Sequence, residues 1–273
     1  MHRWQSALVV ATLSLSAGVT ARAEVGPGET NPRTIMEAVE GRNLGDKVYS
    51  AFTMTIKDGE GRERTRSGVV RTLAHDGGRK GLILFDAPAE IRNTGLLTYD
   101  WDDRAKVDDQ WLYMPALNRT TRITGAGKSG SFLGSDLTFA DMTRRNPTDY
   151  DYVMSDAAAK VDGEDAWLIE ATPTSAREKE ETGYTRAQMW ISKSRLVPLQ
   201  ISATLAKGGK VKRMKFFDIR QVDGIWTAHK LVIRTEKGDQ LQSMTVMSWT
   251  AFAYNRPDVT PEVMTTQRLE QGL

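Results

Sequence analysis

The side chains that could carry acid–base, nucleophilic or metal chemistry are few in this sequence and poorly spaced for it. The chain has no Cys and three His, so it offers no thiol nucleophile. His75 lies in an Asp-Gly-Gly turn and His229 at the start of a predicted strand, without the spacing of a metal-ligand pair. Ser129 and Ser131 lie outside any strand-turn-helix elbow, which disfavours a hydrolase triad. The sequence therefore predicts a protein that is not an enzyme, with no cofactor and no metal.

Carboxylates gather around one predicted hairpin end. They are Asp100, Asp102, Asp103, Asp108 and Asp109. Oxygen ligands of this kind could bind a hard cation, but the regular spacing of a calcium loop is absent. We favour a solvated turn whose charge keeps the end of a sheet soluble and unpaired.

A loop rich in Gly and Ser spans residues 125–134 and carries two bulky apolar side chains, Phe132 and Leu133. It lacks the Walker spacing and has no helix directly after Lys128-Ser129, so it is a weak indication of nucleotide binding. Large apolar side chains on a long loop of small residues need an apolar surface to cover. We predict a mobile flap whose Phe132 and Leu133 close over the open end of a barrel or contact a partner protein.

Four arginines bracket this loop: Arg119, Arg122, Arg144 and Arg145. A basic rim beside an apolar opening would suit lipid phosphate or the acidic side chains of a docking partner. Paired surface charges are an equally good interpretation of the same residues.

Two short helices and a long series of strands must position these residues. Asn31-Pro32 is typical of an N-cap and first helical residue, in a helix that continues to Gly45, and Thr260-Pro261 opens a second helix that ends at Gln271. The predicted strands cover residues 48–57, 62–73, 80–85, 95–101, 110–114, 119–123, 149–154, 166–172, 185–191, 198–205, 210–219, 227–236 and 241–252. Regular short strands joined by tight turns indicate an antiparallel meander that curls into a sandwich or barrel.

Several of these strands have one apolar and one polar face, which predicts a sheet with one dry side. Few helices are available to cover that side. The eleven Met and seven Trp favour an adaptable apolar cavity, although small barrels are usually packed solid. Strand parity assigns the cavity to Phe52, Met54, Ile56, Leu97, Tyr99, Trp101, Leu112, Met114, Met189, Ile191, Leu199, Ile201, Leu205, Met214 and Phe216.

The first 23 residues predict a secretory signal peptide, because Arg3, a short apolar stretch and Ala21-Arg22-Ala23 follow one another. No other segment is long and apolar enough to span a bilayer. Removal of this peptide leaves 35 Lys and Arg against 35 Asp and Glu, and this neutrality disfavours nucleic acid as a partner. Without Cys the chain has no disulfide and no site for lipid attachment. We expect a soluble periplasmic monomer with one domain at residues 24–273.

One long motif in the centre of the chain is similar to the signature sequence of a known protein family. It comprises residues 108–117, the basic strand 119–123 and residues 128–136. This motif closely resembles the signature of the LolA-like family of outer-membrane lipoprotein-sorting proteins, and residues 88–101 are also similar to that family. The chain departs from the pattern with Met114 for Leu, Leu133 for Met, and Ala140 in an aromatic-acid-acid run.

The resemblance implies an incompletely closed β-barrel with short helices as lid or plug and an apolar cavity for acyl chains. It implies a carrier that passes lipidated protein or lipid between inner-membrane machinery and the outer membrane. Members of this branch resemble companions of RND-type inner-membrane transporters, so such a transporter is the expected partner. The alternative is an adaptor that docks on a transporter or envelope complex without cargo. A hydrolase that uses Ser129 or Ser131 is the least favoured hypothesis.

Overall fold

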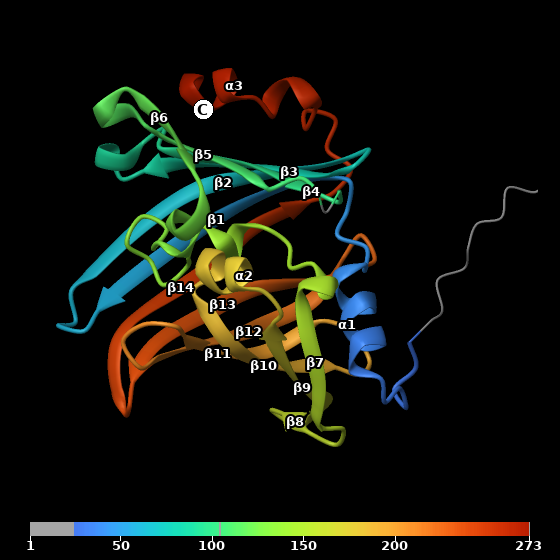
Figure 1. Ribbon diagram of the computed structural model, residues 1–273. Helices are drawn as coiled ribbons and strands as arrows, with labels where there is room; N and C mark the ends of the chain where they lie inside the picture. Colours follow the sequence, from blue (N-terminus) through green and yellow to red (C-terminus); the bar gives the residue numbers. More distant parts are fainter. Residues whose placement is uncertain (1–24, 104, 273) are drawn as a thin grey trace, which may run out of the picture.

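A computed structural model describes residues 25–103 and 105–272, and the predicted signal peptide at residues 1–23 lies outside the described part. One antiparallel sheet dominates the molecule, with short helices packed against it (Figure 1). The strands are β1 (Lys47–Asp58), β2 (Glu63–His75), β3 (Gly78–Ala87), β4 (Gly95–Trp101), β5 (Asp109–Met114), β6 (Arg119–Ile123), β7 (Tyr150–Asp156), β8 (Lys160–Val161), β9 (Glu164–Pro173), β10 (Tyr184–Ser192), β11 (Pro198–Leu205), β12 (Lys210–Val222), β13 (Ile225–Lys237) and β14 (Gln240–Ala253). The α-helices are α1 (Pro32–Glu40), α2 (Ala176–Thr182) and α3 (Thr266–Gln271), and the 3-10 turns are η1 (Ala89–Ile91), η2 (Pro115–Leu117), η3 (Gly125–Ser129), η4 (Ala140–Met142), η5 (Pro147–Asp149) and η6 (Pro261–Val263).

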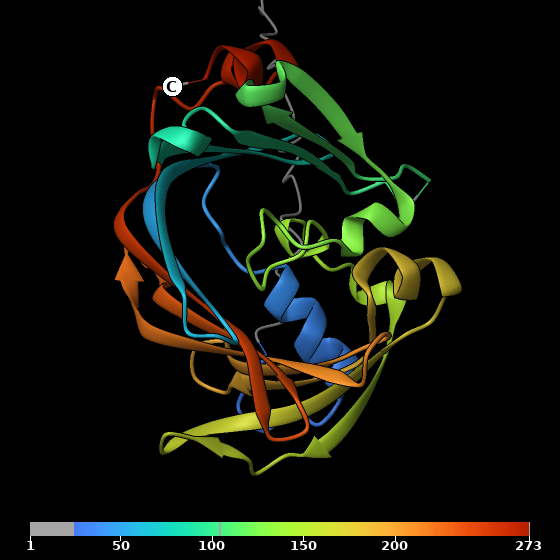
Figure 2. The ribbon, with the colours of Figure 1, turned by 90° about the vertical axis from the view of Figure 1, so that its left-hand side faces the viewer.

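The strands follow the order β6-β5-β4-β3-β2-β1-β14-β13-β12-β11-β10-β9-β7, and β8 pairs with β9. Most neighbours are consecutive in sequence because hairpins join them. Figure 2 shows the sheet curled around an interior that contains α1. Among the described strands, the two edges β6 and β7 do not pair with each other, so the barrel stays half open. This architecture confirms the predicted fold: a curved, incompletely closed antiparallel barrel with a few short helices.

The helix α1 begins where the sequence predicts it. The Asn31 side chain accepts hydrogen bonds from the N–H groups of Arg33 at 3.0 Å and Thr34 at 3.4 Å, which is an N-cap. The helix ends at Glu40, earlier than the predicted Gly45. The predicted C-terminal helix is the turn η6 followed by α3. The helix α2 was not predicted, although Ser175 caps it and Gly183 ends it with φ 72°.

The concave face of the sheet carries the main hydrophobic core. Helix α1 lies in this concavity and buries Ile35, Met36 and Val39 against the sheet. The segment that joins the edge strands β6 and β7, residues 124–149, also folds inward, as Figure 2 shows. Both edges of the open side are therefore tied together by a chain that passes through the interior.

A second core lies on the opposite, convex face, where α3 packs against β4 and β5 and the residues before it complete the cluster. Its buried members are Val69, Leu73, Leu82, Leu84, Leu97, Val259, Met264 and Leu269. The hydroxyl of Tyr99 donates to the Met264 carbonyl at 2.7 Å, which fixes the C-terminal segment on the sheet. The convex face therefore carries a second structural core, completed by the C-terminal segment.

Truncation of Leu269 to alanine tests how firmly this segment is held. Leu269 is fully buried, so Leu269→Ala is expected to lower the free energy of unfolding by about 2–5 kcal/mol. Leu117→Ala is the matched control, because Leu117 is 62% exposed and its truncation is expected to change stability by less than about 0.5 kcal/mol. Urea denaturation of both variants measures the difference, and equal effects would show that α3 is not docked as described.

Candidate functional site

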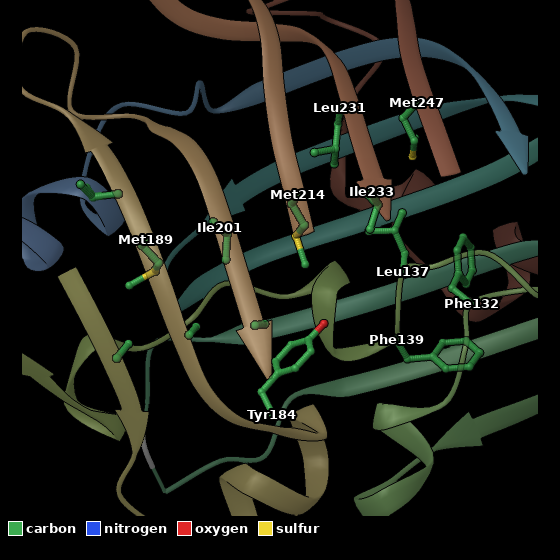
Figure 3. Close-up of a cluster of buried hydrophobic side chains, with 14 of the residues drawn as sticks. Phe132, Leu137, Phe139, Tyr184, Met189, Ile201, Met214, Leu231, Ile233 and Met247 are labelled. Carbon is green, nitrogen blue, oxygen red and sulfur yellow. The ribbon is translucent and has the colours of Figure 1, made fainter. Parts of the chain in front are cut away.

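Residues 130–142, called the interior loop below, fill the middle of the concavity. Phe132 is 1% exposed, and its ring lies 5.9 Å from that of Phe85 and 5.7 Å from that of Phe139. Leu137 and Phe139 belong to the same buried cluster. Figure 3 shows Leu137 beside Ile233 of the sheet and Phe139 below Phe132. The predicted flap residue Phe132 is thus docked in the core, with Leu133 packed against the same cluster.

Asp136 anchors the interior loop to β13 and β14. Its carboxylate accepts hydrogen bonds from the hydroxyls of Thr235 at 2.5 Å, Ser243, and Thr245 at 2.7 Å. Its N–H donates to Thr245 Oγ1 at 2.9 Å. A buried carboxylate requires such donors, because desolvation without partners is costly. The Ser-Asp end of the central sequence motif therefore holds the loop inside the barrel.

Asp141 anchors the other end of the interior loop. Lys212 Nζ donates to Asp141 Oδ2 at 3.0 Å and to the Tyr184 hydroxyl at 2.6 Å, and that hydroxyl donates to Asp141 Oδ1 at 2.8 Å. Burial opposes ionisation of Asp141, but Lys212 and the Thr138 N–H hold its pKa below the usual range. Burial and the Asp141 charge raise the pKa of Tyr184. Lys212 and Asp141 therefore form a buried ion pair, and the Tyr184 hydroxyl is hydrogen-bonded to both of them.

An unfilled chamber of about 410 Å³ remains at one end of the concavity, and we call it the apolar chamber. Its apolar lining comprises Leu44, Val48, Val70, Ile83, Met142, Ile225 and Phe252. Polar and charged residues also line it: Arg42, Ser50, Thr72, Arg79, Lys80, Thr98, Asp100, Asp141, Thr143, Arg144, Thr227 and Tyr254. The volume is within the range of small-molecule sites, which are mostly apolar with a few polar groups that fix orientation.

A second chamber of about 540 Å³, called the acidic chamber below, lies toward α2 and the tip of the β4–β5 hairpin. Its lining carries the acids Glu37, Glu40, Asp100, Asp102, Asp103, Asp108, Asp141, Asp149, Glu178 and Glu181 and the bases Lys106, Lys128, Arg144, Arg145 and Arg177. Several of these charges are paired, as in the contact of 2.9 Å between Lys128 Nζ and Glu181 Oε2. A lining this polar does not suit a hydrocarbon chain.

The two chambers share a wall formed by the end of the interior loop and the residues that follow it. Asp100, Asp141, Thr143 and Arg144 line both chambers. The Arg144 guanidinium donates to both carboxylate oxygens of Asp100, at 3.0 and 3.2 Å, and the backbone N–H of Arg144 donates to Asp100 Oδ2 at 2.8 Å. This two-pronged contact ties the wall to the end of β4.

The predicted cavity residues separate into two groups. Phe52, Met54, Ile56, Leu112, Met189, Ile191, Ile201 and Met214 are buried in the concave core, and Met114, Leu205 and Phe216 pack against it. The apolar chamber lies beyond them, because the interior loop and α1 fill the part of the concavity that these residues face. Among the residues of the predicted cavity, those that face the concave interior are therefore covered in this structure.

Four predicted cavity residues lie outside the concave core, and one of them, Trp101, lines the acidic chamber. Leu97 and Tyr99 belong to the convex core, and Trp101 stacks edge-on against Tyr99 with 5.8 Å between ring centres. Leu199 lies in a small separate cluster with Ala166 and Val197. Alternation along β4 does not show which residues face the concave side, because both faces of this strand are covered by apolar side chains.

The four arginines of the predicted rim do not form one rim. Arg119 is exposed, and Arg122 pairs with Asp109. Arg144 binds Asp100 and Asp102. Arg145 lies inside the barrel, where Tyr150, Asp141, Tyr184 and Glu40 surround it and raise its pKa against the effect of burial.

Ser129, Ser131 and His229, which were considered above for catalysis or metal binding, have structural partners. Ser129 Oγ donates to the Ala126 carbonyl at 2.7 Å, and Ser131 Oγ donates to the Ser135 carbonyl at 2.6 Å. His229 lies between backbone carbonyls and the Arg220 guanidinium. Among the described residues, no group of three or more His, Cys, Asp or Glu has the geometry to hold a metal ion.

Asp108, in the β4–β5 hairpin, is expected to make the stability of the fold depend on pH. Burial raises the pKa of Asp108 from 3.8 to about 6, against the opposing hydrogen bond from the Trp101 N–H. Because the folded pKa exceeds the unfolded one, the stability that protonated Asp108 contributes is complete below about pH 4 and is lost as the pH rises through about 6. Asp108→Asn is expected to remove this loss. Thermal melts at pH 4, 5, 6 and 7 should show that the melting temperature of the wild type decreases relative to that of the variant as the pH rises. The same pH dependence in both proteins would contradict the assignment.

The fold and the interior chambers define a class, the LolA-like curved half-barrels. A proposed outer membrane lipoprotein-sorting protein domain from Vibrio parahaemolyticus matches with a TM-score of 0.78 and 26% identity, covering 88% of this chain and 98% of that one. A DUF1329 family protein from Desulfovibrio piger matches with a TM-score of 0.78, 28% identity, and coverage of 88% and 100%. A LolA superfamily protein from Nitrosomonas europaea shares the fold, with a TM-score of 0.65, 17% identity and coverage of 88% and 100%.

Comparison at the sequence level gives the family. The profile of a family described as "Uncharacterized protein" matches residues 77–271, and the chain belongs to that family. The comparison with curated proteins found no match. In the described part of the chain, no helix has the length and apolar character needed to traverse a bilayer.

Proposed function

We propose that this protein is a periplasmic carrier that shelters acyl chains of a lipid or a lipidated protein during transfer between the inner-membrane machinery and the outer membrane. An RND-type transporter is the proposed donor or acceptor. The observation that carries the proposal is the apolar chamber of about 410 Å³ on the concave side of a LolA-like half-barrel. Similarity to a domain described as a lipoprotein-sorting protein supports the same class of cargo.

The energetics of such a carrier are favourable in the apolar chamber. Each methylene removed from water contributes about 0.8 kcal/mol, so burial of part of a long acyl chain competes with its insertion in a membrane. A chain longer than the chamber would need more room. The interior loop is the proposed source of that room. Its release would have to break the anchors at Asp136 and Asp141 and expose the buried side chains of the loop. It would also break the hydrogen bond of 2.7 Å from the Gln110 side chain to the Phe139 carbonyl.

An adaptor without cargo is the second candidate. The filled centre of the concavity, where Phe132, Leu137 and Phe139 cover the sheet, favours it. In that case the interior loop is a permanent plug and the chain acts through its surface.

Titration with a fluorescent fatty-acyl probe separates the two candidates. The carrier is expected to bind one probe per chain with saturation, and native mass spectrometry of gently purified protein is expected to show bound lipid. Absence of saturable binding together with a lipid-free mass would leave the adaptor.

A further inference from the structure

Two arginine side chains line one part of the apolar chamber. Arg42 and Arg79 both line it, together with the apolar side chains of Val48, Val70 and Ile83. Most arginines that penetrate a protein interior are paired with a carboxylate, because a buried charge without a partner is costly. The partners of these two guanidinium groups therefore indicate what the chamber is built to hold.

The known partners are backbone carbonyls rather than carboxylates. Arg42 Nη1 donates to the Val39 carbonyl at 2.5 Å, and Arg79 Nη1 donates to the Gly45 carbonyl at 2.9 Å. The Nε–H of Arg42 is buried and has no hydrogen-bond partner within the described residues. Neither guanidinium has an ion pair with a carboxylate in the described part of the chain, whereas the neighbouring Arg144 has two.

The electrostatic surroundings agree with this. Burial lowers the pKa of Arg42, and the Glu40 carboxylate compensates only in part from beyond ion-pair distance. Burial and the charge of Arg144 lower the pKa of Arg79, and the carboxylates of Asp46, Asp100 and Asp102 offset this only in part. The acids that also line the chamber are engaged elsewhere, since Asp100 binds Arg144 and Asp141 binds Lys212. Within the described residues, Arg42 and Arg79 are thus left without an ion-paired carboxylate.

We propose that the apolar chamber binds an amphiphile with an anionic head group, held by Arg42 and Arg79, with its hydrocarbon tail against Val70, Ile83, Ile225 and Phe252. The inference rests on the proposed carrier function and specifies the chemistry of the cargo. A carboxylate or a phosphate would satisfy the free N–H groups through charge-assisted hydrogen bonds. The Tyr254 hydroxyl, 2.7 Å from Thr227 Oγ1, supplies a further polar contact at the same end.

The test compares ligands that share a sixteen-carbon tail and differ in the head: palmitate, hexadecyl phosphate and neutral monopalmitoylglycerol, each below its micelle concentration. Affinity is measured by displacement of a neutral fluorescent acyl probe from the full chain. Both anions are expected to bind at least about tenfold more tightly than the neutral lipid. A preference for only one of them identifies whether the head is a carboxylate or a phosphate.

Variants locate the site. Arg42→Gln and Arg79→Gln are each expected to reduce anion affinity about tenfold or more and to leave the neutral lipid unaffected, with partial recovery in Arg42→Lys and Arg79→Lys. Arg119→Gln is the matched control, because Arg119 is an exposed arginine outside the chamber and its loss is expected to change nothing. Thermal melts confirm that each variant is folded.

The outcomes are separable. Equal affinity for anionic and neutral lipids would overturn the head-group assignment and leave the carrier function intact. Unchanged anion preference in folded Arg42→Gln and Arg79→Gln proteins would place the head group elsewhere and also overturn the assignment. Failure of every ligand to bind would reject the carrier function itself.

Discussion

Replacing Lys212 with methionine is expected to lower the free energy of unfolding by about 3–5 kcal/mol, because it leaves the Asp141 carboxylate without its buried cation. Lys212 is 2% exposed, and its ammonium group contacts both Asp141 and the Tyr184 hydroxyl. The methylene stem of the lysine is replaced by a side chain of similar length, so lost packing contributes little. The effect is measured by urea denaturation.

Two further variants make this result specific. The double variant Lys212→Met, Asp141→Asn is expected to recover part of the loss, since the uncompensated charge is removed. Lys215→Met is a matched control on the same strand, because its ion pair with Asp162 is exposed and contributes about 1 kcal/mol or less. Similar losses for Lys212→Met and Lys215→Met would mean that the interior loop is not fixed by a buried pair.

Replacing Ile83 with aspartate is expected to weaken binding of a fatty-acyl probe about 100-fold. Ile83 is on the inward-facing side of β3 and lines the apolar chamber. A carboxylate there must lose its water when hydrocarbon enters, at a cost of about 3 kcal/mol or more. Ile83→Val keeps the wall apolar and is expected to change affinity less than about threefold.

The surface control for this experiment is Val153→Asp. Val153 is 61% exposed on the edge strand β7, so its charge should leave probe binding unchanged. Circular dichroism establishes that Ile83→Asp is folded before binding is compared. Full affinity in a folded Ile83→Asp protein would remove the apolar chamber from consideration as the acyl site.

Much of the fold could be predicted from local signals. The alternation of Phe52, Met54 and Ile56 with polar residues gives both the strand and its inward face, and Asn31-Pro32 gives the start of α1. The helix α2 was within reach of the same reasoning, because Ser175 and Glu178 have the spacing of a capping box and Gly183 follows. Its highly charged sequence shows no apolar stripe, so periodicity alone did not reveal it.

The site was harder to predict because it depends on contacts between distant parts of the chain. The sequence shows that Phe132 must cover something apolar, but the hydroxyl partners of Asp136 come from β13 and β14, about a hundred residues further along. Parity alone cannot show which part of the dry face the interior loop covers. The chamber therefore lies beyond the predicted residues, at Val48, Val70 and Ile83.

Photo-crosslinking tests the central claim most directly. A palmitate analogue with a diazirine near the end of its tail is bound to the full chain, irradiated, and mapped by peptide mass spectrometry with and without excess palmitate. We expect adducts, suppressed by competitor, on inward-facing residues of β2, β3 and β14 such as Val70, Ile83 and Phe252. Adducts confined to the convex face around Trp111 and Leu269, or adducts that competitor does not suppress, would contradict an acyl-binding chamber inside the barrel.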